Sequence, residues 1–168
     1  MITVVDVETS WQVTDTGGYD PSPYHPDNIL VSVGINDEYY FTNHSERIDD
    51  GCYHNIQSIL DKTTLLVGHN IKFDLMWLIE AGFKYTGKVY DTMLGEYILN
   101  RGIRKSLTLE MSCRRRRIGS KDSRIKEFTD RGIPFQNIPS GLVEEYGRMD
   151  VQITRDLFNS QMADFRMP

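Results

Sequence analysis

The sequence predicts a mixed α/β fold, in which helices pack on a β-sheet. Strand-like patterns dominate residues 1–42, and helix-like and strand-like patterns then alternate as far as residue 100. The 168 residues, 39% of them hydrophobic, are enough for one full core. We therefore expect a single domain over residues 1–168.

The first part of the chain predicts three strands. The β-branched run "TVVDVET" at 3–9 is typical of a strand. Residues 14–28 are rich in Gly, Pro, Asp and Asn, which predicts a long surface loop or a wide hairpin connection. Apolar runs at 29–35 and 38–42 flank a turn-like Asn-Asp pair and predict two antiparallel strands.

The rest of the chain predicts mainly helices. The expected elements are helices over 53–61, 71–83, 92–100, 106–119 and 141–162, strands at 64–68 and 88–92, and a polar irregular segment over 120–140. Asp91 stands just before one of these helices, and we expect it to cap that helix.

Composition excludes several classes of protein. The net charge of −5 argues against binding nucleic acid mainly through overall positive charge. Cys52 and Cys113 lack the spacing of zinc sites and are too few for a disulfide framework, so free thiols are expected. No signal peptide or membrane span is evident, which predicts a soluble, intracellular and cytoplasmic protein without membrane association.

Two carboxylates of the first predicted strand occupy positions where their charges would destabilise the fold. Asp6 and Glu8 point to the same face of an apolar strand, and a buried like-charge pair needs a proton or a cation. Asp74 lies one turn into a predicted helix, and Tyr146 and Asp150 share one helix face at spacing i, i+4. If the strand is central and both helices cross near it, the four carboxylates converge. Such hard oxygen ligands suit Mg²⁺ or Mn²⁺.

Three motifs resemble those of a known family. "DVET" at 6–9, "HNIKFD" at 69–74 and "YGRMD" at 146–150 resemble the motifs of the DEDD superfamily of 3′–5′ exonucleases. The segment "YDTMLGEYILN" at 90–100 resembles the proofreading domain of family A DNA polymerases, and the resemblance covers nearly the whole chain. Glu145 stands where the histidine-type sister group has His, so the chain resembles the tyrosine-type subgroup.

The resemblance implies a ribonuclease H-like fold and hydrolysis of the terminal phosphodiester with two divalent ions, Mg²⁺ or Mn²⁺. It implies that Asp6, Glu8, Asp74 and Asp150 hold the ions and that Tyr146 orients the attacking water. The implied substrate is single-stranded DNA or a frayed 3′ end.

Substrate contacts are expected around this site, each with a structural alternative. Thr9 matches the family threonine close to the terminal nucleotide. Asn70 is expected to contact the substrate backbone or to satisfy a strand-to-helix turn, and Trp11 to stack on a base or to pack. The run Arg114, Arg115, Arg116, Arg117 is either a solvated face or a strip that follows phosphates.

Partners and alternatives follow from the same resemblance. The chain ends about one helix after the third motif, so we expect no fused polymerase and either a free-standing enzyme or one that works with a separate DNA polymerase. A proofreading-like domain that starts at residue one resembles viral polymerases, which is compatible with a viral protein in a host cell. The alternatives are a ribonuclease D-like exoribonuclease and a catalytically silent nucleic-acid-binding or polymerase accessory module.

Overall fold

The structure is a computed structural model, and it describes residues 1–119 and 123–166. In chain order its elements are β1 (Ile2–Thr9), β2 (Gln12–Val13), β3 (Tyr19–Asp20), β4 (Leu30–Ile35), β5 (Glu38–Phe41), α1 (Cys52–Lys62), β6 (Leu65–Gly68), α2 (Ile71–Glu80), β7 (Lys88–Asp91), α3 (Thr92–Leu99), α4 (Leu109–Arg115), α5 (Arg124–Asp130), a 3₁₀ turn η1 (Phe135–Asn137) and α6 (Ser140–Arg166).

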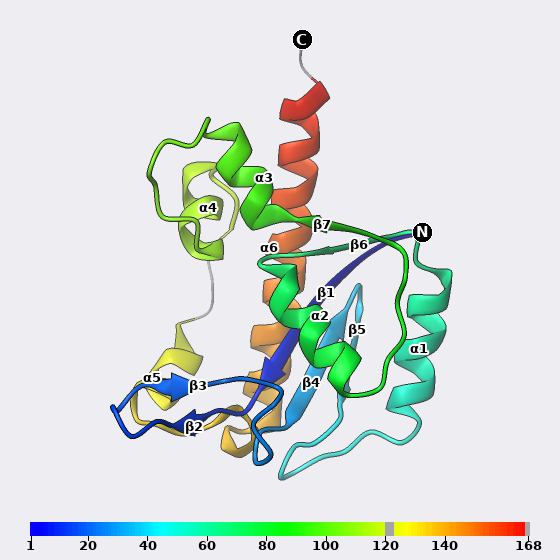
Figure 1. Cartoon of the computed structure of the whole chain (residues 1–168), viewed down its shortest axis with the longest axis vertical. Helices are drawn as coiled ribbons and strands as arrows, with labels where there is room; N and C mark the ends of the chain where they lie inside the picture. The colour runs from blue at the N-terminus through cyan, green and yellow to red at the C-terminus, as the bar shows by residue number, and fades with distance from the viewer. Residues whose placement is uncertain (120–122, 167–168) are drawn as a thin grey trace.

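A five-stranded mixed sheet forms the centre of the molecule (Figure 1). Its strand order is β5-β4-β1-β6-β7, with β4 antiparallel to β1 and β5, and with β6 and β7 parallel to β1. The first predicted strand is therefore central. This mixed sheet with flanking helices confirms the predicted α/β, ribonuclease H-like architecture.

Alternate residues of β1 point to two different layers of helices. Val5 and Val7 belong to the core cluster that contains residues of α1 and α2. Val4, on the other face, packs in a cluster with Val151 and Phe158 of α6. Helix α6 thus covers one face of the sheet, and α1 and α2 cover the other (Figure 1). The even-numbered residues of β1 face α6.

The prediction of an irregular segment over 120–140 was wrong for most of the residues that the structure describes there, because they form α5 and η1. Residues 120–122 lie outside the described residues. Ile125, with Phe128 and Phe135 partly buried, packs with Phe41 of β5 in a core cluster. The few apolar residues of this segment therefore find their partners only in the tertiary structure.

The segment after α3 differs from expectation at its bounds. Helix α4 is shorter than the predicted 106–119, because the Thr108 side chain caps its first turn by accepting from the Met111 N–H. Arg117 then has a positive φ of 56°, which ends the helical path. Of the two alternatives for residues 14–28, a surface loop or a wide hairpin connection, the structure has a short hairpin at the start of the segment, in which β3 pairs with β2.

Other expectations concern single groups. Asp91 caps α3, as predicted, by accepting from the Met93 N–H at 2.8 Å. Cys52 and Cys113 are both buried, and no disulfide joins them within the described residues 1–119 and 123–166. Within residues 1–119 and 123–166, no helix has the length and apolar character needed to cross a membrane.

Candidate active site

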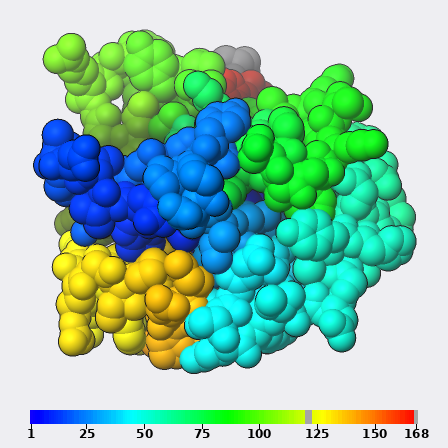
Figure 2. Space-filling model, turned by 60° about the horizontal axis from the view of Figure 1, so that its bottom comes forward, coloured from blue at the N-terminus to red at the C-terminus, as the bar shows by residue number. Residues whose placement is uncertain are grey.

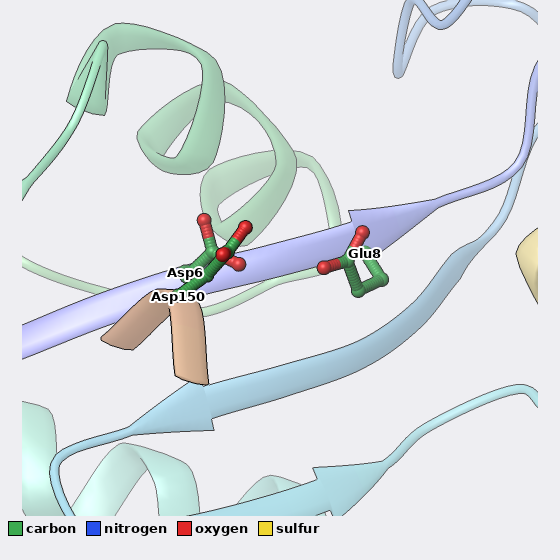
Figure 3. Close-up of side chains that lie close together, drawn as sticks. All are labelled: Asp6, Glu8 and Asp150. Carbon is green, nitrogen blue, oxygen red and sulfur yellow. The ribbon is translucent and has the colours of Figure 1, made fainter. Parts of the chain in front are cut away.

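Three carboxylates converge between β1 and α6. Asp6 and Glu8 extend from β1, and Asp150 extends from α6 toward the same space (Figure 3). Each offers one oxygen, and these oxygens all lie within 4.8 Å of one another. Glu8 and Asp150 are buried, and Asp6 is half-buried. The fold therefore brings together three of the four carboxylates that the motifs single out.

The donor set fits a hard divalent cation. Around Mg²⁺, ligand oxygens at about 2.1 Å stand about 3 Å apart when adjacent and about 4.2 Å apart when opposite. The three carboxylate oxygens, which all lie within 4.8 Å of one another, are close to that range. Oxygen-only donors favour Mg²⁺ or Mn²⁺ over the softer transition metals.

Asp74 is positioned by the end of a parallel strand. Strand β6 pairs with β1 only as far as Val4 and ends at Gly68, so β1 continues beyond its neighbour. There the backbone N–H of Val7 donates to Asp74 Oδ1 at 3.0 Å. Burial raises the pKa of Asp74 well above its usual value, and the charge of Asp6 raises it further. Asp74 thus stands beside Asp6, next to the group of three.

Tyr146 lies one turn before Asp150 on α6 and is half-buried. Its ring centroid is 5.9 Å from that of Phe135, which is also 5.9 Å from the ring of Trp11. Trp11 in turn meets Tyr19 edge to face at 5.7 Å. We call these four residues the aromatic row. It connects the third motif to the β2–β3 hairpin, and Figure 2 shows this N-terminal region, in blue, next to the yellow α5 region.

Thr9 and Asn70 are fixed by local backbone geometry. The β1–β4 register shifts between Glu8 and Thr9, and such irregularities re-aim side chains next to functional sites. Thr9 is buried. Asn70 has a left-handed backbone with φ of 59°, a conformation that Asn tolerates better than most residues. Its N–H donates to Asp91 Oδ1 at 2.9 Å, and its side chain is exposed without capping α2.

Tyr39 borders the site although no motif includes it. It is 5% exposed, and its hydroxyl is hydrogen-bonded to Ser32 Oγ at 2.8 Å and donates to the Val143 carbonyl at 3.3 Å. Burial, followed by the charge of Glu8, raises its pKa well above the usual value. Tyr39 therefore links β4, the start of α6 and the surroundings of Glu8. In the sequence it is one more aromatic residue of a strand, and nothing distinguishes it.

The arginine run divides into two pairs. Arg115 and Arg116 are partly buried and donate to the carboxylate of Glu96, which is 2% exposed, at 3.3 and 2.7 Å. Arg116 also pairs with Asp164 of α6. These contacts join α3, α4 and α6. Arg114 and Arg117 are exposed. The two middle arginines thus have a structural role that the sequence did not reveal.

The chain is similar in sequence to one family. The family model described as 3′–5′ exonuclease matches residues 14–163, which include Asp74, Tyr146 and Asp150, while Asp6 and Glu8 precede the matched range. No curated protein matches the chain significantly.

Three solved structures share its fold, and each is aligned over 96% of this chain. A nuclease in its apo form is 17% identical with a TM-score of 0.64, and 72% of that chain is covered. The family B DNA polymerase of the archaeon Pyrobaculum calidifontis is 16% identical with a TM-score of 0.68. The POL domain of Pol1 from M. smegmatis, in complex with DNA primer-template and dNTP, is 14% identical with a TM-score of 0.59. The chain spans 24% of the length of each of these two polymerase chains. With the family model matching most of its length, the chain belongs to the 3′–5′ exonuclease family.

Proposed function

We propose that this chain hydrolyses the terminal phosphodiester of single-stranded DNA from the 3′ end and depends on two divalent ions, Mg²⁺ or Mn²⁺. The observation that supports the proposal most is the convergence of Asp6, Glu8 and Asp150 beside Asp74. Four acidic side chains at the junction of a central strand and two helices are destabilising without cations.

Each residue of the site has a proposed role. Asp6, Glu8, Asp74 and Asp150 hold the two ions. Bound divalent ions would stabilise negative charge on the attacking and leaving oxygens of the reaction. Tyr146, one helical turn from Asp150, orients the attacking water through its hydroxyl group. The water oxygen forms the new bond to phosphorus, and the bond from phosphorus to the leaving 3′ oxygen breaks.

The terminal nucleotide is held by residues around the carboxylates. Thr9 follows Glu8 at the end of β1 and contacts this nucleotide in our proposal. Trp11, half-buried in the aromatic row, offers ring surface on which a base can stack. Asn70, within the second motif, has an exposed side-chain amide that can bind the backbone of the DNA strand.

A proofreading role with a DNA polymerase is supported by the two polymerases among the structures that share this fold. In such a role the exonuclease removes a mispaired, frayed primer end. The presence of all four carboxylates favours an active enzyme over a catalytically silent binding module.

Incubation of 5′-labelled single strands and mismatched primers with Mg²⁺, Mn²⁺ or EDTA tests the proposal. We expect a ladder that shortens from the 3′ end with either ion and no products in EDTA. Asp150→Asn should lose most of the activity, and Glu80→Gln, an exposed carboxylate of α2, should keep it.

Matched RNA strands in the same assay decide between DNA and RNA as the substrate. Faster hydrolysis of RNA would identify a ribonuclease instead. Failure to cleave any end-labelled strand with either ion would overturn the proposal.

A further inference from the structure

The two exposed members of the arginine run line a cavity together. Helix α4 ends at Arg115, and the following turn is closed by the Arg117 N–H donating to the Arg114 carbonyl at 3.2 Å. Because Arg117 has a positive φ, the chain turns back and both side chains border one hollow. This cavity has a volume of about 520 Å³, and Glu110 and Ile118 also line it.

A second cavity connects this place to the candidate active site. It has a volume of about 490 Å³ and is lined by Tyr146, Phe135 and Lys126, among others. Glu110 lines both cavities, so they are neighbours on the surface. A path therefore leads from Tyr146, past Lys126, to Arg114 and Arg117. We call this path the basic groove.

We infer that the basic groove holds the sugar-phosphate backbone of the single strand behind its 3′ end, and that Arg114 and Arg117 bind its phosphates. The inference rests on the proposed function, because the strand must have its 3′ end at the carboxylates. Planar guanidinium groups bind phosphate oxygens in pairs, and a hollow lined by cations concentrates an anionic ligand. Arg115 and Arg116 take no part, since Glu96 and Asp164 bind them.

Removal of the Glu110 charge should change the affinity for a DNA strand in the opposite direction to removal of the arginine charges. Glu110 is exposed at the junction of the two cavities, where its charge repels a passing phosphate. Removing this charge should therefore strengthen the binding of a strand, whereas removing the arginines should weaken it. A general loss of protein stability would not produce this pair of results.

The experiment measures binding of a labelled oligothymidylate to the whole chain at several salt concentrations, in EDTA to prevent hydrolysis. For Arg114→Gln/Arg117→Gln we expect the log–log salt slope to fall by about 1.4, or about 0.7 for each phosphate contact of a single strand. Arg114→Lys/Arg117→Lys should recover most of the slope, because it keeps the charges. Glu110→Gln should bind more tightly than the wild type.

Two comparisons make the result specific. Lys62→Gln/Lys84→Gln removes two exposed charges near the end of α1 and after α2, away from α4 (Figure 1), and should leave the slope unchanged. Hydrolysis in Mg²⁺ should depend on strand length: Arg114→Gln/Arg117→Gln should lower kcat/KM for a long strand and leave it unchanged for a dinucleotide.

The outcomes also separate this inference from the proposed function. A salt slope that is the same in the wild type and in Arg114→Gln/Arg117→Gln would overturn the basic groove while hydrolysis stays intact. Another outcome is that the salt slopes of the wild type and of Arg114→Gln/Arg117→Gln differ as expected, but the wild type hydrolyses no DNA strand. This outcome would overturn the proposed activity and support the basic groove.

Discussion

The carboxylate of Asp74 should lower the stability of the folded protein in a pH-dependent way. Burial and the charge of Asp6 raise its pKa, so the folded protein binds this proton more tightly than the unfolded chain does. The free energy of unfolding should then fall as the pH rises from the unfolded value, about 3.9, through the folded pKa. In EDTA we expect Asp74→Asn to be more stable than the wild type at pH 8, with the difference shrinking toward pH 5. Urea unfolding of both proteins across this range measures it.

Asp49 provides the control with the opposite sign. Burial alone would raise its pKa, but the Arg47 side chain and the Phe41 N–H, which both donate to it, lower the net value. Its contribution to stability is therefore present above about pH 4 and lost as the pH falls through the lower folded pKa. Asp49→Asn should thus be less stable than the wild type at pH 8.

The outcome that would contradict the prediction for Asp74 is a pair of parallel curves of unfolding free energy against pH for the wild type and Asp74→Asn. Such curves would show that Asp74 is not held in its uncharged form.

At the scale of elements, the close approach of α6 to the sheet sets the position of the third motif. A methyl group on Gly147 would lie 2.8 Å from Cζ of Tyr39 and closer to its Oη, and this ring is held by two hydrogen bonds. Overpacking of this kind costs about 1–3 kcal/mol. We expect Gly147→Ala to lose stability by about that amount and to lose activity as well, because α6 carries Tyr146 and Asp150. Thermal unfolding and strand hydrolysis measure the two effects.

Gly141 is the matched control, since it lies in the first turn of the same helix and a methyl group added there would meet no atom within 4 Å. Alanine is the better helix former, so Gly141→Ala should gain up to about 1 kcal/mol and keep full activity. Equal effects of the two substitutions would mean that α6 can move away from Tyr39 without cost.

The sequence predicted those elements whose signal is local. The run from 3 to 9 has both the composition of a strand and two motif carboxylates, so the central strand was found. Tyr146 and Asp150 have both helical spacing and motif side chains, so the last helix was found as well. Helix α5 was missed because its apolar residues are few and depend on Phe41 of β5 for packing. Its stability comes from tertiary contacts, which no short window of sequence contains.

The same distinction applies to the site. The motif residues could be named from their order, but the difference between Arg114 and Arg115 depends on Glu96, which is 19 residues from Arg115 and on another helix. Tyr39 is likewise recognisable only once Gly147 lies over it. Long-range partners decide which of several identical side chains turns inward.

For the whole molecule, the site joins the two ends of the chain. Asp6 and Glu8 belong to the first strand and Asp150 to the last helix, so the unfolded chain has no comparable cluster. A ligand that binds only the folded state raises the free energy of unfolding of the whole chain, by about 2.7 kcal/mol when the free ligand concentration is 100 times its Kd. We therefore expect Mg²⁺ or Mn²⁺ to raise the urea midpoint of the wild type, measured in EDTA and then with excess ion.

Asp150→Asn tests whether this gain comes from the carboxylate cluster. Without ions, the substitution removes one of the repelling charges, so the variant should be at least as stable as the wild type. With excess ion it should gain much less, because one of the three oxygens within 4.8 Å has lost its charge. Glu80→Gln, on the exposed end of α2, should gain as much as the wild type. An equal gain in Asp150→Asn would place the ions elsewhere on this acidic chain, since the repulsion between Asp6, Glu8 and Asp150 would then have no part in their binding.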